Sequence, residues 1–111
     1  MTIHTQPENN AMVVTVNGRL DTVTQAAFDD KIRELIDGGN HRLVVDLEQL
    51  AYISSAGLRG MLTMAQLLKE KDGRVCLANV KNNVRAVFDM SGLSPLFQIE
   101  DSVGAALACM E

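Results

Sequence analysis

Short apolar runs recur along this chain, and their composition predicts the strands of a sheet. Residues 11–16 are rich in β-branched side chains and end at an Asn17-Gly18 pair, which predicts a strand closed by a turn. Residues 42–47 and 74–78 are apolar without alternation, which is typical of strands buried on both faces. With two weaker patterns included, strands are expected at residues 2–6, 11–16, 42–47, 74–78 and 96–99.

The segments between these runs carry apolar residues at the spacing of one helix face. Residues 21–24, rich in N-cap side chains, precede the first predicted helix, and residues 38–40 stop it. The apolar faces of the four predicted helices are Phe28, Ile32, Leu35 and Ile36; Leu58, Met61, Leu62, Ala65 and Leu68; Val80, Val84, Val87 and Phe88; and Val103, Ala106, Leu107 and Met110. This alternation predicts an α/β fold, with a mixed sheet of four to five strands and about four helices packed on it.

Composition narrows the function without identifying it. The chain has 111 residues, which fits a single domain spanning residues 1–111. Its net charge of -4 is offset by no Lys/Arg cluster, so binding to nucleic acid or to an anionic membrane surface is not expected. The sequence shows no signal peptide, membrane-length apolar run or disulfide framework, so we expect a cytoplasmic protein. We also expect no metal, no cofactor and no enzymatic activity, because no ligand cluster or catalytic triad has suitable spacing.

Two serines mark the stretch in which function is expected, because Ser54 and Ser55 stand where a loop after a buried strand leads into a helix. A helix start presents unpaired backbone N–H groups and the positive end of the macrodipole. A serine there can cap the helix, or it can accept a phosphoryl group that those amides would stabilise. The residues alone leave both readings open, and they also allow Gly57 and Gly60 to serve close helix packing.

Residues 46–58, which include Ser54-Ser55-Ala56-Gly57, resemble the signature of STAS domains, particularly the bacterial anti-sigma-factor antagonists. Residues 18–21 (Gly-Arg-Leu-Asp), residues 92–93 (Gly-Leu) and residues 96–97 (Leu-Phe) resemble weaker motifs of the same family. The resemblance covers nearly the whole chain and implies a STAS fold.

The resemblance also implies a mechanism known as partner switching. The unphosphorylated antagonist binds an anti-sigma factor that is a serine kinase of the histidine-kinase-like ATPase type, and this binding releases the sigma factor. The kinase then phosphorylates a serine at the start of the helix, the complex dissociates, and a PP2C-type phosphatase resets the antagonist. Adding about 1.5 to 2 negative charges in the middle of an interface would break it.

The resemblance transfers the phosphorylation site to Ser55, with Ser54 as the second choice. The best-known motif has aspartate and two serines before the glycine, and the matching positions here are Ser54, Ser55 and Ala56. Ala56 adjoins Gly57 and cannot accept a phosphate, so the motif departs from that form. Under the resemblance the partner-binding residues are Asp21, Tyr52, Ile53, Ser54, Ala56, Gly57 and Arg59. The residues alone equally allow Tyr52 and Ile53 to pack under the loop, and Arg59 to be a solvated side chain with no partner.

Asp21 has two interpretations. By resemblance it lies beside Ser55 and helps to present it to the kinase, and it can equally be the N-cap of the first helix. The alternative to a phosphorylation switch is a constitutive STAS scaffold or a transporter-associated subunit that uses the same surface without being phosphorylated.

Overall fold

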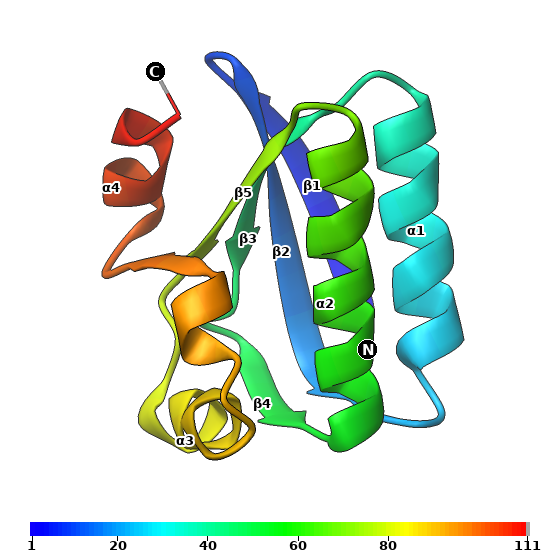
Figure 1. Ribbon diagram of the computed structural model, residues 1–111, viewed down its shortest axis with the longest axis vertical. Coiled ribbons are helices and arrows are strands. Elements are labelled where there is room, and N and C mark those ends of the chain that lie inside the picture. The colour runs from blue at the N-terminus through cyan, green and yellow to red at the C-terminus, as the bar shows by residue number, and fades with distance from the viewer. Residues whose placement is uncertain (111) are drawn as a thin grey trace.

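The computed structural model describes residues 1–110, and in them a mixed sheet carries helices on both faces (Figure 1). Its strands are β1 (Thr2–Glu8), β2 (Ala11–Leu20), β3 (Arg42–Asp46), β4 (Leu50–Ile53), β5 (Arg74–Ala78) and β6 (Gln98–Glu100). Its α-helices are α1 (Gln25–Asp37), α2 (Ser55–Glu70), α3 (Asn82–Met90) and α4 (Val103–Ala108), with a 3₁₀ helix, η1, at Ser94–Leu96.

The sheet has the order β1-β2-β3-β5-β6, and β4 pairs with β2 off this path. β1 and β2 form an antiparallel hairpin, whereas β2, β3, β5 and β6 pair in parallel. Parallel neighbours put Val14 opposite Val45 and Val45 opposite Leu77, so apolar side chains line up across the middle of the sheet. This register confirms the prediction that the runs near residues 42–47 and 74–78 form buried central strands.

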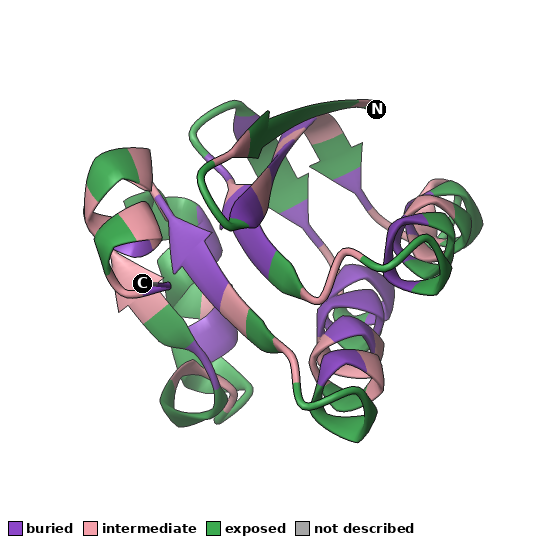
Figure 2. Cartoon of the chain, turned by 90° about the horizontal axis from the view of Figure 1, so that it is seen from above, coloured by how far each residue is buried: buried purple, intermediate pink, exposed green. Residues whose placement is uncertain are grey.

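Two apolar cores lie on opposite faces of the sheet, as the burial pattern in Figure 2 shows. The larger core packs α1, α2 and α3 against one face and contains Phe28, Met61 and Phe88. The smaller core places Ala106 and Met110, at the C-terminal end, over Cys76 on the other face. The α/β class and the four predicted helices are therefore confirmed, with three helices on one side and α4 alone on the other.

The sheet has six strands rather than the predicted four to five. Residues 50–53 were expected to be loop, and they pair with the last residues of β2 as β4. β2 itself does not end at the Asn17-Gly18 pair but continues to Leu20. Gly18, at φ +97, donates its N–H to Gln49 O at 3.0 Å, and the register shifts between Gly18 and Arg19. The predicted turn is therefore absent, because pairing with β4 outweighs the local turn preference, and the register shift leaves Ala51 of β4 as the extra residue.

Candidate functional site

The site lies where β2 and β4 end side by side and α2 begins. Leu20, the last residue of β2, is in register with Ile53, the last residue of β4. The N–H of Ser54 donates to Leu20 O at 3.0 Å, which fixes the start of α2 against the end of β2. Residues 19–21 and 52–55 are therefore neighbours at the carboxyl edge of the parallel strands, where folds of this kind usually bind ligands.

Ser54 is the N-cap of α2. Its backbone is extended, with φ -102 and ψ 177, and its side chain accepts the N–H of Gly57 at 3.4 Å. This arrangement satisfies one of the helix amides that would otherwise be unpaired. The capping interpretation is thus confirmed for Ser54, which is half-buried.

Ser55 occupies the first position of α2, and unlike Ser54 it is exposed. Within residues 1–110, no side-chain hydrogen bond engages its hydroxyl. The free N–H groups of the first turn and the positive end of the helix macrodipole lie next to this oxygen. Such a position is chemically suited to carry a phosphoryl group, because phosphate oxygens accept several hydrogen bonds.

Two glycines allow α2 to approach its neighbours closely. A Cβ atom on Gly57 would lie 2.5 Å from Leu20 O and 2.8 Å from Ile53 Cγ1. On Gly60 it would lie 3.1 Å from Asp29 Oδ1 of α1. Gly57 therefore packs α2 on the end of β2, and Gly60 packs α2 on α1, as the close-packing interpretation predicted.

Asp21 organises the turn between β2 and α1. Its Oδ1 atom accepts the N–H of Val23 at 3.0 Å and the N–H of Thr24 at 3.2 Å. Desolvation raises the pKa of the Asp21 carboxyl, but hydrogen bonds from Thr24, Val23 and Arg19 outweigh it and lower the pKa below its ordinary value of 3.8. The N-cap of α1 is Thr24 rather than Asp21, so that prediction is wrong by three residues, because Asp21 caps the preceding turn instead.

Arg19 joins Asp21 to Tyr52 across the two strands. Its guanidinium carbon lies 4.3 Å from the centre of the Tyr52 ring, which is a cation–π geometry. Its Nε atom lies 3.5 Å from Asp21 Oδ2. No role was predicted for Arg19, although it belongs to the Gly-Arg-Leu-Asp motif at residues 18–21. The pairing depends on the shifted register after Gly18, which no local pattern reveals.

The predicted partner-binding residues differ in exposure. Tyr52, at 40%, and Arg59 are exposed, as is the predicted phosphorylation site Ser55, whereas Asp21 and Ser54 are half-buried. Ile53 is 2% exposed, Ala56 is 4% exposed, and Gly57 is buried. Ile53, Ala56 and Gly57 pack beneath the surface and support it, so their predicted role in partner binding stays a prediction that their burial does not favour.

A hollow beside Ser55 extends the site toward α3. Its volume is about 270 Å³, and it is lined by Ser55, Leu58, Arg59, Leu62, Ser91 and Leu93. Ser91 and Leu93 come from the end of α3 and the turn after it, so sequence spacing did not connect them with Ser55. The Gly92-Leu93 pair was the available signal, because it belongs to one of the weaker family motifs.

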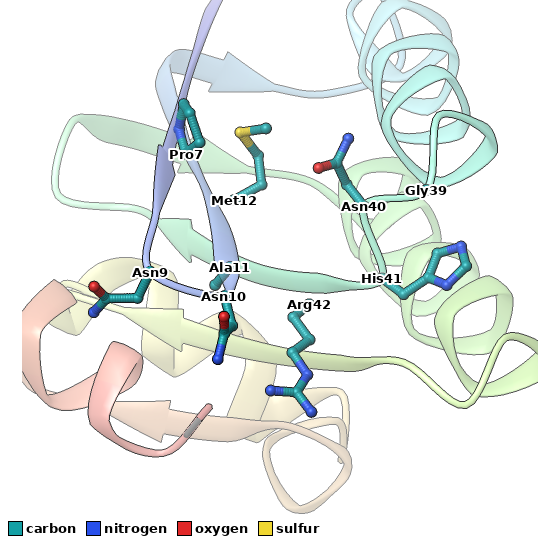
Figure 3. Close-up of a pocket in the computed structure, with 9 residues that line it drawn as sticks. All are labelled: Pro7, Asn9, Asn10, Ala11, Met12, Gly39, Asn40, His41 and Arg42. Carbon is teal, nitrogen blue, oxygen red and sulfur yellow. The ribbon is translucent and has the colours of Figure 1, made fainter.

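A second, more polar hollow lies at the amino-terminal ends of the parallel strands, opposite the carboxyl edge (Figure 3). Its volume is about 390 Å³, and the side chains around it include Asn9, Asn10, Asn40, His41 and Arg42. None of the predicted site residues lines it.

Two further features of the described chain bear on function. Residues 1–110 contain no group of three His, Cys, Asp or Glu side chains arranged to hold a metal ion. Across the same residues, every helix is too short or too polar to cross a membrane.

The chain is similar to known proteins over most of its length. The sequence profile described as STAS domain matches residues 2–106. A Bordetella bronchiseptica protein named as an anti-sigma factor antagonist, BtrV, is 33% identical over 100 residues, which cover 90% of this chain and 86% of that protein. The anti-sigma-B factor antagonist of Staphylococcus aureus is 23% identical over 101 residues, covering 91% of this chain and 94% of that protein.

Solved structures share the fold at lower identity. The Bacillus cell fate determinant SpoIIAA in its phosphorylated form superposes with a TM-score of 0.76 at 22% identity, covering 99% of this chain and all of that one. An anti-sigma factor antagonist from Mycobacterium paratuberculosis superposes with a TM-score of 0.88 at 23% identity, covering 97% of this chain and 92% of that one.

Proposed function

The chain belongs to the STAS domain family, and from this premise we propose that it is an anti-sigma-factor antagonist that acts by partner switching. In its unphosphorylated form it binds an anti-sigma factor that is a serine kinase of the histidine-kinase-like ATPase type. Phosphorylation of Ser55 ends the binding, and a PP2C-type phosphatase restores it. The protein is a binding partner rather than an enzyme in this cycle, which we place in the cytoplasm.

The single observation that carries the proposal is the contrast between Ser54 and Ser55. The hydroxyl of Ser54 caps α2, whereas Ser55 is an exposed residue at the helix start whose hydroxyl makes no side-chain hydrogen bond within residues 1–110. A phosphoryl group on Ser55 would be stabilised by first-turn N–H groups without disturbing the fold. This difference supports Ser55 over Ser54 as the acceptor. The named relatives support the wider role, and SpoIIAA exists in both unphosphorylated and phosphorylated forms.

The surface around Ser55 is suited to a reversible protein contact. Tyr52, stacked under Arg19, offers an aromatic ring, and Arg59 offers a cation one helical turn after Ser55. Aromatic residues and arginine are the side chains that most often dominate binding energy at interfaces. A phosphate of about 1.5 to 2 negative charges among them would change the charge of the whole surface.

The test compares capture of an ATPase from lysate of the source organism by wild-type, Ser55→Ala and Ser55→Glu proteins. We expect wild type and Ser55→Ala to retain a histidine-kinase-like ATPase and Ser55→Glu to lose it by about 100-fold in affinity, as for a charge buried at an interface. Thr5→Glu, which adds the same charge on the exposed face of β1, is the matched control and is expected to bind like wild type.

Phosphorylation is tested separately with the captured ATPase and ATP. Mass spectrometry is expected to place the phosphate on Ser55 in wild type and in Ser54→Ala, and to find none in Ser55→Ala. If Ser55→Glu captures the same ATPase as wild type, the protein is a constitutive scaffold and the switch is rejected.

A further inference from the structure

A third hollow continues the surface beside Ser55 along the length of α2. Its volume is about 380 Å³, and it shares Leu62 with the hollow that Ser55 lines. The two hollows together form a groove bounded by α2 on one side and by the end of α3, η1 and β5 on the other, and we call it the α2 groove. The far half of the α2 groove is lined by Leu62, Ala65, Gln66, Leu68, Lys69, Gly73, Val75 and Leu96.

The far half presents an apolar side chain that the fold holds outward. Leu96 is 59% exposed, although it lies next to Phe97, which is 8% exposed. Phe97 is fixed in the core by an edge-to-face contact with Phe88, with ring centres 5.6 Å apart. Because η1 ends at Leu96 and the chain turns inward at Phe97, Leu96 is held at the rim of the groove rather than exposed by chance. Met90, at the end of α3, is also outward, at 88% exposure.

The charge of the α2 groove is opposite to that of the protein. The chain carries a net charge of -4, yet the charged side chains that line the groove are Arg59 and Lys69. The nearest acid on α3, Asp89, is already engaged by Arg85 at 3.5 Å and by the hydroxyl of Ser94. The groove therefore offers an apolar floor with one cation near each end, which is complementary to an acidic amphipathic segment.

We propose that the α2 groove binds an amphipathic helix of the partner, with its apolar stripe on Leu62 and Leu96 and its acidic side chains at Arg59 and Lys69. This inference rests on the proposed function and names the part of the partner that the groove recognises. Arg59 and Lys69 are ten residues apart on α2, which is about 15 Å at a rise of about 1.5 Å per residue. The partner helix therefore needs about three turns, and its apolar residues recur at three- and four-residue spacing.

The groove also connects the partner helix to the switch. Ser55 and Arg59 are four residues apart on α2, so their side chains lie on one face of the helix. A phosphoryl group on Ser55 would pair with the guanidinium that the partner's acidic residue needs, and it would repel that residue. Phosphorylation at one end of the groove thus weakens the binding of a partner helix that contacts the whole length of the groove.

The test measures the affinity of the purified, captured ATPase for variants of the far half, which lies away from the phosphorylation site. Leu96→Asp removes an apolar contact and adds a repelling charge, and Lys69→Glu reverses the far cation. We expect each to weaken binding at least about tenfold, as for contacts in the centre of an interface. Arg33→Glu, which makes the same charge reversal on an exposed position of α1, is the control and is expected to stay within about twofold of wild type.

Each outcome decides the proposal. Leu96 and Lys69 are exposed, so matching thermal unfolding of the variants and wild type will show that the fold is intact. Equal affinity of both variants and wild type overturns the groove while leaving the Ser55 switch standing. Failure of wild type to bind any ATPase overturns the proposed function and the groove together. Conversion of a wild-type dimer to a monomer by Leu96→Asp also overturns it, because the occupant is then a second copy of this chain.

Discussion

A hollow lies at each end of the parallel strands, and each hollow adjoins a different kind of helix terminus. The carboxyl-edge hollow adjoins the start of α2, and the amino-edge hollow adjoins the end of α1. At the carboxyl edge α2 begins, and the exposed residue Ser55 lies at the positive end of its dipole. At the amino edge α1 ends, and its last carbonyls accept hydrogen bonds, Leu35 O from the Asn40 side chain at 3.1 Å and Ile36 O from His41 Nε2 at 3.1 Å. Donors gather at a helix C-terminus and acceptors at a helix N-terminus for the same electrostatic reason.

This difference shows that the polar side chains lining a hollow must first be sorted into those that already make hydrogen bonds within the fold and those that do not. Only the second kind marks the hollow as a candidate binding site. The amino-edge hollow is the larger, at about 390 Å³ against about 270 Å³ beside Ser55. Its side chains Asn40, His41 and Arg42 are engaged in holding the fold, since Arg42 donates to Met110 O at 2.7 Å. The hollow at the carboxyl edge is smaller, and the hydroxyl of Ser55 beside it makes no side-chain hydrogen bond within residues 1–110. We therefore expect changes at the amino edge to alter stability alone.

The largest expected effect tests how rigidly the carboxyl edge is built. Gly57→Ala puts a Cβ atom 2.5 Å from the backbone oxygen of Leu20, so the start of α2 must shift. We expect a loss of about 3 kcal/mol in the free energy of unfolding, as for overpacking against backbone. Gly104→Ala in α4 is the control, because its Cβ would meet only Ser102 Oγ at 3.8 Å. Urea unfolding measures both, and equal stability of Gly57→Ala and wild type would show that α2 is free to move off β2.

The next prediction concerns the amino edge. Arg42→Ala removes the hydrogen bond to Met110 O that ties the chain after α4 to β3, and we expect it to lower the free energy of unfolding by about 1.5 kcal/mol. Affinity for the captured ATPase is expected to stay within about twofold of wild type. Arg33→Ala, on the exposed face of α1, is the matched control for loss of an arginine. Loss of ATPase binding in Arg42→Ala would reject the division of roles between the two edges.

A smaller effect separates the two serines. Ser54→Ala removes the N-cap of α2, and we expect it to lower the free energy of unfolding by about 1 kcal/mol. Ser54→Asp keeps an acceptor for the Gly57 N–H and is expected to restore that stability. Ser55→Ala is expected to change stability by less than about 0.5 kcal/mol, because an exposed residue without a hydrogen bond contributes little. Thermal unfolding distinguishes the variants. A larger loss of stability in Ser55→Ala than in Ser54→Ala would show that Ser55, not Ser54, caps α2.

The parts of the fold that the sequence predicted are those in which burial repeats regularly. The central strands and the apolar faces of four helices were predicted because each carries a long periodic pattern. β4 was missed because Leu50 and Ile53 are buried while Ala51 and Tyr52 are exposed, which is too short a pattern to distinguish strand from loop. The continuation of β2 past Gly18 was missed because a local turn signal was outweighed by pairing with a strand that was itself unpredicted.

The candidate site shows the same division between local and long-range information. Ser54, Ser55 and Gly57 were found because the residue types at the start of a helix form a local sequence pattern. The contact of Arg19 with Tyr52 and the lining by Leu93 join segments distant in the sequence, so no spacing could reveal them. Burial of Ile53 was also not evident, because a residue at the end of a strand can face either way until its partner is known.

The smallest predicted effect tests whether the charge of Asp21 or only its shape holds the turn beside Ser55. Asp21→Asn keeps an oxygen for the N–H groups of Val23 and Thr24 but removes the negative charge. The folded-state pKa of Asp21 lies below its ordinary value of 3.8, so the charged form stabilises the fold above that pH. The advantage of wild type over Asp21→Asn is therefore expected at pH 7 and should disappear as the pH falls below 3.8 and through the folded-state pKa.

Thermal unfolding of both proteins from pH 7 down to pH 2 measures this advantage, with Asp30→Asn on the exposed side of α1 as the control. A difference that persists unchanged at the lowest pH would mean that geometry rather than charge stabilises the turn. In that case Arg19 would be held over Tyr52 by stacking alone, because its ion pair with Asp21 at 3.5 Å would contribute nothing. A difference that vanishes with Asp21 protonation would instead make the carboxylate a structural part of the carboxyl edge, as its hydrogen bonds indicate.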